Sequence, residues 1–425
     1  MSQFISTDGA KKFKRTRLTC FYTYLAMSSV FSLPPILFLT FRETYGISYT
    51  LLGTLVLINF CTQLIIDLIF TFFSKHFNVH KTVRIMPLIT STGLTVYAIV
   101  PMLFPQFAYA GLVAGTVIFS VAAGLCEVLL SPLVAAMPSD NPEKDMSTLH
   151  SLYAYGVTAV VVISTLFFLL FGRENWMYLT LFFALLPIIS AVLFSISPLP
   201  EMKLSESTSQ SKSKGKYYAL ALCTACIFLG SAAENSMTNW ISGYVENVLS
   251  IPKAAGDIFG LTLFAILLGI ARTLYAKYGK NILRVLIISM IGSTVCYLIA
   301  ALSPLPAVSL IACVLMGFCT SMLWPGTLIL MEEKIPGVGV AAYALMAAGG
   351  DLGASVAPQL LGIVVDTVSC APGAKALASS LSITAEQLGM KVGMLGASLF
   401  PLAGIFLLIY MRSFFKRQSK LKNEG

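Results

Sequence analysis

The stretch "PEMKLSESTSQSKSKGK", residues 200–216, divides a chain that is otherwise strongly apolar. It is rich in Ser and Lys and has no periodic pattern of apolar residues, which is typical of a flexible, solvated linker. Long apolar segments follow one another closely on both sides of it. We therefore predict two halves of similar size, joined by a linker over residues 199–216.

The composition indicates that the chain is surrounded partly by lipid. Of its 425 residues, 57% are hydrophobic and only 11% are charged, whereas a soluble domain carries roughly 25% charged residues. A membrane-spanning helix needs about 20 apolar residues, and twelve segments meet that need. Six precede the linker, at residues 18–40, 49–73, 85–104, 107–137, 149–171 and 176–198. Six follow it, at residues 217–244, 255–276, 283–303, 305–331, 339–366 and 389–411. The predicted class is an all-α integral membrane protein.

The distribution of Lys and Arg sets the predicted orientation. With the N-terminus in the cytoplasm, 23 of the 28 Lys and Arg fall in cytoplasmic segments and five fall outside. Cytoplasmic loops carry such an excess, so we expect both termini inside. The expected parts are a cytoplasmic tail at 1–17, a six-helix bundle at 18–198, the linker at 199–216, a second bundle at 217–411 and a tail at 412–425.

The net charge of +9 is thereby explained as a topology signal, and no nucleic-acid partner is expected. The first apolar run is long enough to span the bilayer, so we expect it to be retained rather than cleaved as a signal peptide. The plasma membrane is the expected location, which in a bacterium is the inner membrane.

The two halves echo each other at one position. "DLIFTFFSKHF" at 67–77 and "GIARTLYAKYG" at 269–279 each end the second span of their half. In both, a Thr is followed by two residues, a small residue and Lys. This correspondence predicts two pseudo-symmetric six-helix bundles.

One carboxylate stands out in the fourth span. "VAAGLCEVLLSPLVAAM", residues 121–137, has a single charged residue, Glu127, and Ser120 and Ser131 share its face. Ionisable residues inside spans are costly and usually functional. Such a Glu is protonated when enclosed and ionises when water or a partner reaches it. We predict that Glu127 couples transport to protons; the alternative is a permanently protonated structural Glu.

A polar stripe runs along the seventh span, in "FLGSAAENSMTNWISGY". Its members have the spacing i, i+3, i+4, i+7 and are Ser231, Glu234, Asn235 and Thr238. Such a face must line a cavity or a polar helix interface. We predict that Glu234 shares proton coupling and that the other three contact a hydroxyl-rich solute. Trp240 would offer a flat apolar surface to a sugar ring.

The second span carries Asn59, Gln63 and Asp67 at intervals of four, which keeps them on one side of the helix. Asn59 and Gln63 are predicted substrate contacts. Asp67 lies nearer the cytoplasm and is predicted to take part in gating, through an ion pair for which Arg272 is one candidate partner.

Three softer signals complete the predicted site. Asp351, in "AYALMAAGGDLGASVAP", has either a proton-coupling or a structural pairing role. In "SMLWPGT", Trp324 contacts either the solute or a neighbouring helix, while Pro325 interrupts the helical hydrogen bonds and allows bending during gating. Tyr153, near the start of the fifth span, is a further predicted substrate contact.

The sequence offers no sign of an enzyme or a cofactor. His76 and His80 are four residues apart but have no third ligand, so no metal site is predicted. A Walker A sequence and an HExxH motif are both absent. We expect no cofactor other than a coupling ion, H⁺ or alternatively Na⁺.

Three stretches resemble the major facilitator superfamily and, within it, the fucose–proton symporter family. They are "GLCEVLLSPLVAAMPSDNPEKDMSTLHSLYAYG", "FLGSAAENSMTNWISGYV" and "MLWPGTLILMEEKIPGVGVAAYALMAAGGDLGASVAPQLLG". The resemblance spans essentially the whole chain and implies twelve helices, alternating access, small sugar-like substrates and a protonatable Glu in the fourth helix, which falls on Glu127. The acid that the fucose transporters carry in the first helix is absent here, so Glu234 or Asp351 is expected to share the coupling.

The leading hypothesis is a monomeric, proton-coupled symporter of a sugar or similar small polar solute. A proton-linked efflux pump for amphipathic compounds is the main alternative. A membrane receptor that binds a solute without transporting it is a further one.

Overall fold

The computed structural model describes residues 2–73, 77–139, 142–200, 214–335 and 340–423. These residues are almost entirely helical and contain no strand. Twelve of the helical segments are long and apolar enough to cross a membrane. The prediction of an all-α fold with twelve spans is therefore confirmed.

The chain forms two compact units. Unit 1 comprises residues 1–47 and 58–206, and unit 2 comprises residues 48–57 and 207–425. Most of the predicted linker, residues 201–213, lies outside the described residues, so the limits of the two predicted bundles stay a prediction.

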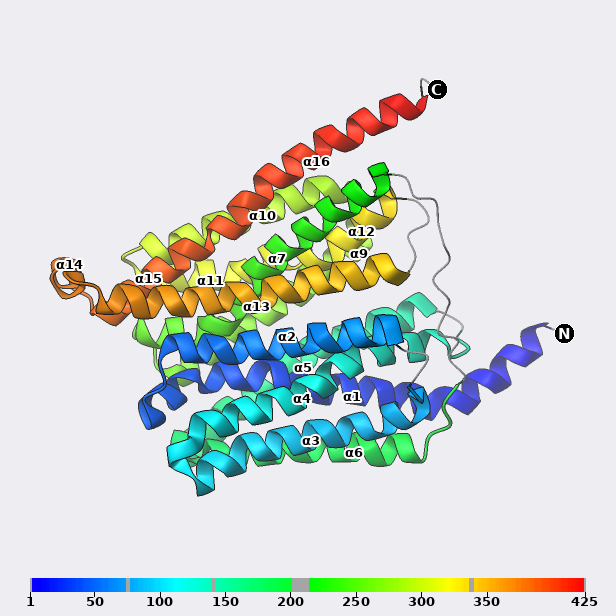
Figure 1. The fold of residues 1–425 in the computed structure, drawn as a ribbon, viewed down its shortest axis with the longest axis horizontal. Coiled ribbons are helices and arrows are strands. Elements are labelled where there is room, and N and C mark those ends of the chain that lie inside the picture. Colours follow the sequence, from blue (N-terminus) through cyan, green and yellow to red (C-terminus); the bar gives the residue numbers. More distant parts are fainter. Residues whose placement is uncertain (1, 74–76, 140–141, 201–213, 336–339, 424–425) are drawn as a thin grey trace. The chain divides into compact units, whose positions relative to one another are not determined.

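The long helices described in unit 1 can be followed in Figure 1. They are α1 (Ser2–Tyr45), α2 (Tyr49–Phe73), α3 (Val79–Leu103), α4 (Ala108–Ala135), α5 (Pro142–Phe171) and α6 (Trp176–Ser195). The first residues of α2, up to Leu57, belong to unit 2. The 3₁₀ turns η2 (Pro105–Phe107) and η3 (Arg173–Asn175) precede α4 and α6.

The start of α1 and the end of α6 lie at the same end of unit 1. The Arg15 guanidinium donates to the carbonyl oxygen of Ile196, and Thr16 Oγ1 donates to Pro198 O at 2.5 Å. An even number of spans places both ends of the unit on one side. Which side faces the cytoplasm stays a prediction.

Helices α3 and α4 approach each other at glycines. A Cβ on Gly93 would lie 2.5 Å from the backbone nitrogen of Phe119, and one on Gly115 would lie 2.6 Å from Tyr97 Cβ. Gly111 and Gly115 of α4 are four residues apart, the spacing that lets two membrane helices pack backbone to backbone. Small residues therefore fix the position of α4, the helix that carries Glu127.

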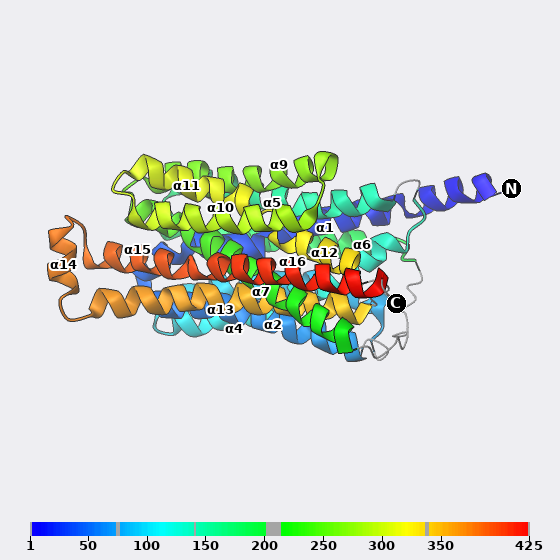
Figure 2. The same cartoon turned by 90° about the horizontal axis from the view of Figure 1, so that it is seen from above.

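Unit 2 contains the remaining helices (Figure 2). They are α7 (Lys214–Asn247), α8 (Lys253–Gly256), the π-helical η4 (Asp257–Thr262), α9 (Leu263–Tyr278), α10 (Ile282–Leu302), α11 (Pro306–Thr320), α12 (Leu323–Lys334), α13 (Val340–Cys370), α14 (Ala374–Ser380), α15 (Ala385–Ala397) and α16 (Leu399–Asn423). Within unit 2, α14 lies at the end away from the C-terminus (Figure 2).

Several predicted spans differ in detail from the helices observed; α1, for example, begins at Ser2 rather than at residue 18. The span expected at 305–331 is two helices, α11 and α12, because a turn at Ser321–Met322 separates them. The last span begins earlier than expected, at Ala385, where Thr384 and Gln387 form a capping box. This box satisfies backbone donors that would otherwise be unpaired at the start of α15.

Glycines also bring α13 and α7 together. A Cβ on Gly353 would collide with the carbonyl oxygen of Phe228, and one on Gly349 would lie 2.6 Å from Thr224 Cγ2. The glycines flanking Asp351 therefore serve close helix packing, and Asp351 itself is buried.

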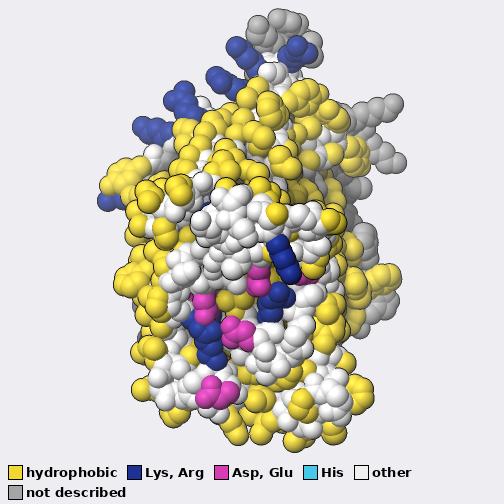
Figure 3. Space-filling model, turned by 90° about the vertical axis from the view of Figure 1, so that its left-hand side faces the viewer, with side chains coloured by type: hydrophobic (Ala, Val, Ile, Leu, Met, Phe, Trp, Pro, Cys, Tyr) yellow, Lys and Arg dark blue, Asp and Glu magenta, His cyan; other side chains and the backbone are white. Residues whose placement is uncertain are grey.

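Large apolar side chains are exposed along both units, such as Leu169 and Leu170 of α5 and Ile288 of α10. A soluble protein rarely leaves so many uncovered. Figure 3, seen from the side on which α14 lies in Figure 1, shows hydrophobic side chains over much of the surface and a group of Lys, Arg, Asp and Glu side chains toward the middle of the face. This pattern fits helices whose sides meet lipid and whose ends meet water.

Candidate functional site

In unit 1, Glu127 lies on α4 as part of a polar group in an apolar surrounding. Its side chain is half-buried. The Tyr24 hydroxyl of α1 hydrogen-bonds to Ser131, one turn further along α4, and interacts electrostatically with Glu127 and Tyr153. Tyr24 of α1 thus links the carboxylate and the hydroxyl on α4 to the phenol on α5.

The structure adds Tyr24 to the candidate residues and places Tyr153 in the same group, while the role of Tyr153 as a substrate contact stays a prediction. The Tyr153 ring of α5 also meets Phe31 edge-on, with 5.7 Å between ring centroids. Tyr24 had no spacing signal in the sequence, because the nearest phenol, Tyr22, is two residues away and faces another side of the helix, where it donates to Leu186 O of α6.

Asn59 and Gln63 hydrogen-bond within unit 1. Gln63 Nε2 donates to Asn59 Oδ1 at 3.0 Å, and Ser120 Oγ of α4 donates to the same oxygen at 2.6 Å. All three side chains are buried, as is Asp67 one turn below Gln63. The network joins α2 to α4, so these amides serve helix–helix contact; their role as substrate contacts stays a prediction.

In unit 2, Glu234 of α7 faces Arg272 of α9. Arg272 Nη2 lies 3.8 Å from Glu234 Oε1, and both side chains are partly exposed. Arg272 Nε donates to the carbonyl oxygen of Ser321 at 3.0 Å. Within unit 2, Arg272 is therefore paired with Glu234, and an ion pair between Asp67 and Arg272 stays a prediction.

The rest of the predicted stripe on α7 is locally bonded. Asn235 Nδ2 donates to Ser231 Oγ at 3.2 Å, and Thr238 Oγ1 donates to Glu234 O at 2.9 Å. Ser231 is fully buried, whereas Glu234, Asn235 and Thr238 are half-buried. These three form the accessible part of the stripe.

The two predicted tryptophans occupy different surroundings. Trp240 is only 2% exposed, donates its indole N–H to Pro358 O at 3.1 Å and packs 5.5 Å from the Tyr49 ring. It contributes to packing in unit 2 and is too buried to be among the proposed solute contacts. Trp324 is half-buried and lies against Gly350, where any Cβ would collide with its ring.

Two acids that the sequence analysis did not weigh hold the first turn of α2 within unit 2. Asp366 of α13 accepts hydrogen bonds from the backbone nitrogens of Tyr49 and Thr50, at 3.3 and 2.6 Å. The Tyr49 hydroxyl donates to Glu386 of α15, which also accepts from Asn247 Nδ2 at 3.0 Å. Carboxylates stabilise the positive end of a helix dipole, so Asp366 caps α2 from a distant part of the chain.

We expect Asp366→Ala to lower the free energy of unfolding by about 1–2 kcal/mol, because α2 loses a charged N-terminal cap. Thermal unfolding of the purified protein in detergent measures this. Asp366→Asn is the matched control: it retains an acceptor oxygen and should lose less. Unfolding of Asp366→Ala at the wild-type temperature would contradict the capping role.

A second group missed by the sequence analysis is a buried ion pair at the start of the eighth span. Lys253 Nζ lies 3.1 Å from Asp257 Oδ2, and the two side chains are 5% and 1% exposed. Lys253 also donates to Ser242 Oγ of α7 at 2.9 Å, and Ser242 donates to Asp257. The i, i+4 spacing of Lys253 and Asp257 could have indicated this ion pair. Lys253 was instead counted in the sequence as a charge of an outer loop.

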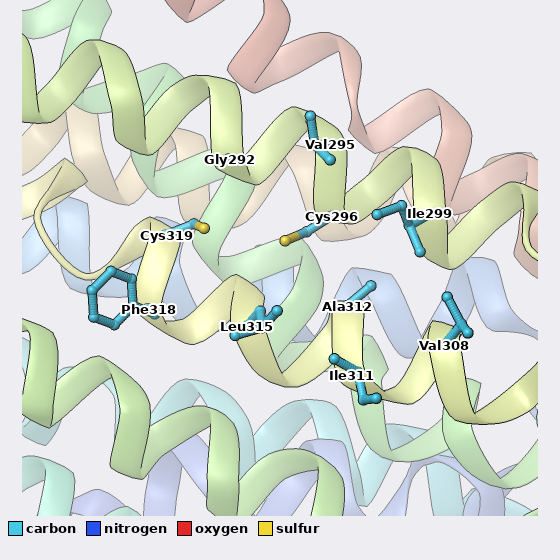
Figure 4. Close-up of a pocket in the computed structure, with 10 residues that line it drawn as sticks. All are labelled: Gly292, Val295, Cys296, Ile299, Val308, Ile311, Ala312, Leu315, Phe318 and Cys319. Carbon is cyan, nitrogen blue, oxygen red and sulfur yellow. The ribbon is translucent and has the colours of Figure 1, made fainter.

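An apolar cavity lies between α10 and α11 (Figure 4). It has a volume of about 380 Å³, and the thiols of Cys296 and Cys319 point into it. Ile311, Leu315 and Phe318 in its lining are exposed on the surface of unit 2. Such a lining offers no polar partner to a sugar. Among the described residues, no three His, Cys, Asp or Glu side chains lie close enough to bind one metal ion.

The fold is shared with solved transporter structures. A bacterial homologue of the human lysosomal transporter Spinster, inward-facing and occupied, has a TM-score of 0.72 at 12% identity, over 96% of this chain and 98% of that one. A D-xylose–proton symporter gives 0.71 at 13% identity, over 92% and 97%. The fucose:proton symporter of E. coli gives 0.57 at 12% identity, over 92% and 99%. Nucleoside and proton-dependent oligopeptide transporters are also similar in structure.

Sequence comparison gives the family but no near relative. No curated protein matches the chain in sequence. The family model described as the Major Facilitator Superfamily matches residues 19–358. The resemblance inferred from the three quoted stretches is thereby confirmed at the level of the superfamily. With that match across most of its length and twelve apolar helices in the superfamily fold, the chain belongs to the major facilitator superfamily, whose members are multi-pass membrane transporters and not enzymes.

Proposed function

We propose that this transporter carries a sugar or similar small polar solute together with protons. The observation that carries the proposal is the half-buried Glu127 in the membrane-spanning helix α4, beside the Tyr24 hydroxyl, Ser131 and Tyr153. A carboxylate in such a place is a functional group by default. Sugar–proton symporters among the similar structures support the substrate class.

The coupling follows from the cost of enclosing a charge. An ionised Glu127 favours states in which water reaches it, because burying an unpaired carboxylate is expensive. A proton removes that cost, so the loaded carrier can close around the residue. Glu234 and Asp351, two of the acids in spans of unit 2, are the proposed partners in coupling.

The proposed solute contacts are the accessible hydrogen-bonding groups near the two glutamates. They are Tyr153 in unit 1 and Asn235 and Thr238 in unit 2, with Trp324 as an apolar surface. Amide and hydroxyl groups both donate and accept, which suits a hydroxyl-rich solute. Ser231, Asn59 and Gln63 position these helices, and Asp67, Arg272 and Pro325 take part in gating.

The proposal also covers the orientation in the membrane, the oligomeric state and the coupling ion. The excess of Lys and Arg in alternate loops supports cytoplasmic termini in a plasma membrane, by the positive-inside rule. A monomer suffices for alternating access between two bundles. H⁺ is the proposed coupling ion, with Na⁺ as the variant to be tested.

Uptake into proteoliposomes under an imposed pH gradient tests the function. Radiolabelled pentoses, hexoses and deoxyhexoses are offered beside a nucleoside, a dipeptide and an amphipathic dye. We expect accumulation of a sugar when the outside is acidic, its collapse with a protonophore, and no dependence on Na⁺.

Other outcomes point to the alternatives. Dye extrusion would favour an efflux pump, and nucleoside or dipeptide uptake would change the substrate class. Saturable sugar binding without any flux would indicate a receptor and overturn the transport proposal.

A further inference from the structure

The break between α11 and α12 has a specific cause in the sequence. In a continuous helix, the carbonyl oxygen of Ser321 would accept from the backbone nitrogen four residues later. That residue is Pro325, which has no N–H. The chain turns at Ser321–Met322, and regular bonding resumes with Gly326 N donating to Met322 O at 2.8 Å. Pro325 therefore leaves one backbone acceptor open inside a membrane-spanning segment.

Arg272 of α9 donates the hydrogen bond that Pro325 cannot donate to the Ser321 carbonyl oxygen. Its Nε donates to Ser321 O at 3.0 Å, while Nη2 of the same guanidinium lies 3.8 Å from Glu234 Oε1. The planar guanidinium can hold two acceptors in a fixed geometry. One side chain thus connects an acid on α7 to the broken segment between α11 and α12.

Glu234 retains capacity for a further partner. Its Oε2 is buried and accepts no hydrogen bond among the described residues. At 3.8 Å, the contact of Oε1 with Arg272 is longer than a strong charged hydrogen bond. A proton, or a hydrogen-bond donor of a solute, can therefore bind the carboxylate and weaken its hold on Arg272.

We propose that Arg272 links occupation of Glu234 to the bend between α11 and α12. With Glu234 ionised and empty, the guanidinium is fixed and keeps the Ser321 carbonyl bonded. When a proton or a hydrogen-bond donor of the solute binds the Glu234 carboxylate, Arg272 loses its ion pair. The guanidinium then holds the Ser321 carbonyl less firmly, and the turn at Ser321–Met322 becomes mobile. Arg272 acts here as a positioning residue, and the inference deepens the proposed transport function, on which it rests.

Because α12 packs against α13, a change in the bend between α11 and α12 also affects α13. Trp324 lies on the first turn after the break and rests against Gly350, the neighbour of Asp351 on α13. A change in the bend therefore moves the contact between α12 and α13. This connects the predicted coupling residue Glu234 to the predicted gating residue Pro325.

Hydrogen–deuterium exchange read by mass spectrometry tests the link without any solute or gradient. Peptides that span residues 313–331 are compared in purified wild type, Glu234→Gln and Arg272→Gln. Losing one hydrogen bond should raise exchange at the break by about threefold to tenfold, in both variants. Arg284→Gln removes an exposed arginine from α10 and is the matched control, for which no change is expected.

The same comparison in a Pro325→Ala protein decides whether the Ser321 carbonyl is the link. This substitution restores an N–H that can bond to Ser321 O, so the carbonyl no longer depends on Arg272. Adding Arg272→Gln to Pro325→Ala should then leave exchange unchanged. An equal rise in both backgrounds would overturn the link, as would unchanged exchange in Glu234→Gln.

A further variant covers the case in which Pro325→Ala does not fold. Arg272→Lys keeps the positive charge but cannot hold two acceptors at once, so exchange should rise as in Arg272→Gln. Wild-type exchange in Arg272→Lys would show that charge alone matters and would refute the bridge. Because the readout is the backbone, it stays valid whichever solute or ion the transporter carries.

Discussion

Replacing Glu127 by Gln is expected to reduce pH-driven accumulation to the level of protein-free liposomes. The amide has nearly the shape of the protonated acid but cannot release a proton, so the carrier loses the step that ties solute movement to the gradient. Exchange of labelled for unlabelled solute needs only the closed, neutral form, and we expect it to persist. Uptake and counterflow measured in the same proteoliposomes separate the two effects.

Glu174→Gln is the matched control, because Glu174 is an exposed acid of the same unit. It should retain both accumulation and exchange. Normal proton-driven accumulation by Glu127→Gln would remove Glu127 from the coupling mechanism. Loss of both activities would instead indicate a structural or binding role for its carboxylate.

The fold was predictable because its determinants are local in the sequence. An apolar run long enough to span a bilayer identifies a helix without knowledge of its neighbours. The split of the tenth span was only partly predictable: Pro325 signalled a weak point, but the turn lies three to four residues earlier. The reason is that a proline removes the hydrogen bond to the carbonyl of the preceding turn, here that of Ser321.

The contacts of the site were less predictable, because they join distant residues. Helical spacing identified the stripe around Glu234, but it could not identify the partner Arg272, which lies on another helix. Asp366 caps a helix whose first turn lies 317 residues before it. Trp240 resembles a sugar platform in the sequence, and only its bond to Pro358 O reveals a packing role. Spacing predicts the face of a helix but not what covers it.

Lys253→Ala, which breaks the buried pair Lys253–Asp257, is expected to lower the free energy of unfolding more than the other single substitutions. Asp257 is 1% exposed, and in Lys253→Ala it would keep, among the described residues, the Ser242 hydroxyl as its side-chain donor. Removing one partner of a buried pair typically costs about 3–5 kcal/mol, since the remaining charge is left uncompensated. The π-helical turn that begins at Asp257 should loosen with it. Thermal unfolding in detergent measures the loss.

The double variant Lys253→Met with Asp257→Leu separates charge from packing. It removes both charges and fills the same space with apolar groups, so most of the stability should return, as buried ion pairs are often replaceable in this way. Lys375→Ala removes an exposed lysine from α14 and should change nothing. If the double variant is as unstable as Lys253→Ala, the pair acts through its shape and its bond to Ser242. If Lys253→Ala unfolds like wild type, the ion pair does not stabilise the start of the eighth span at all.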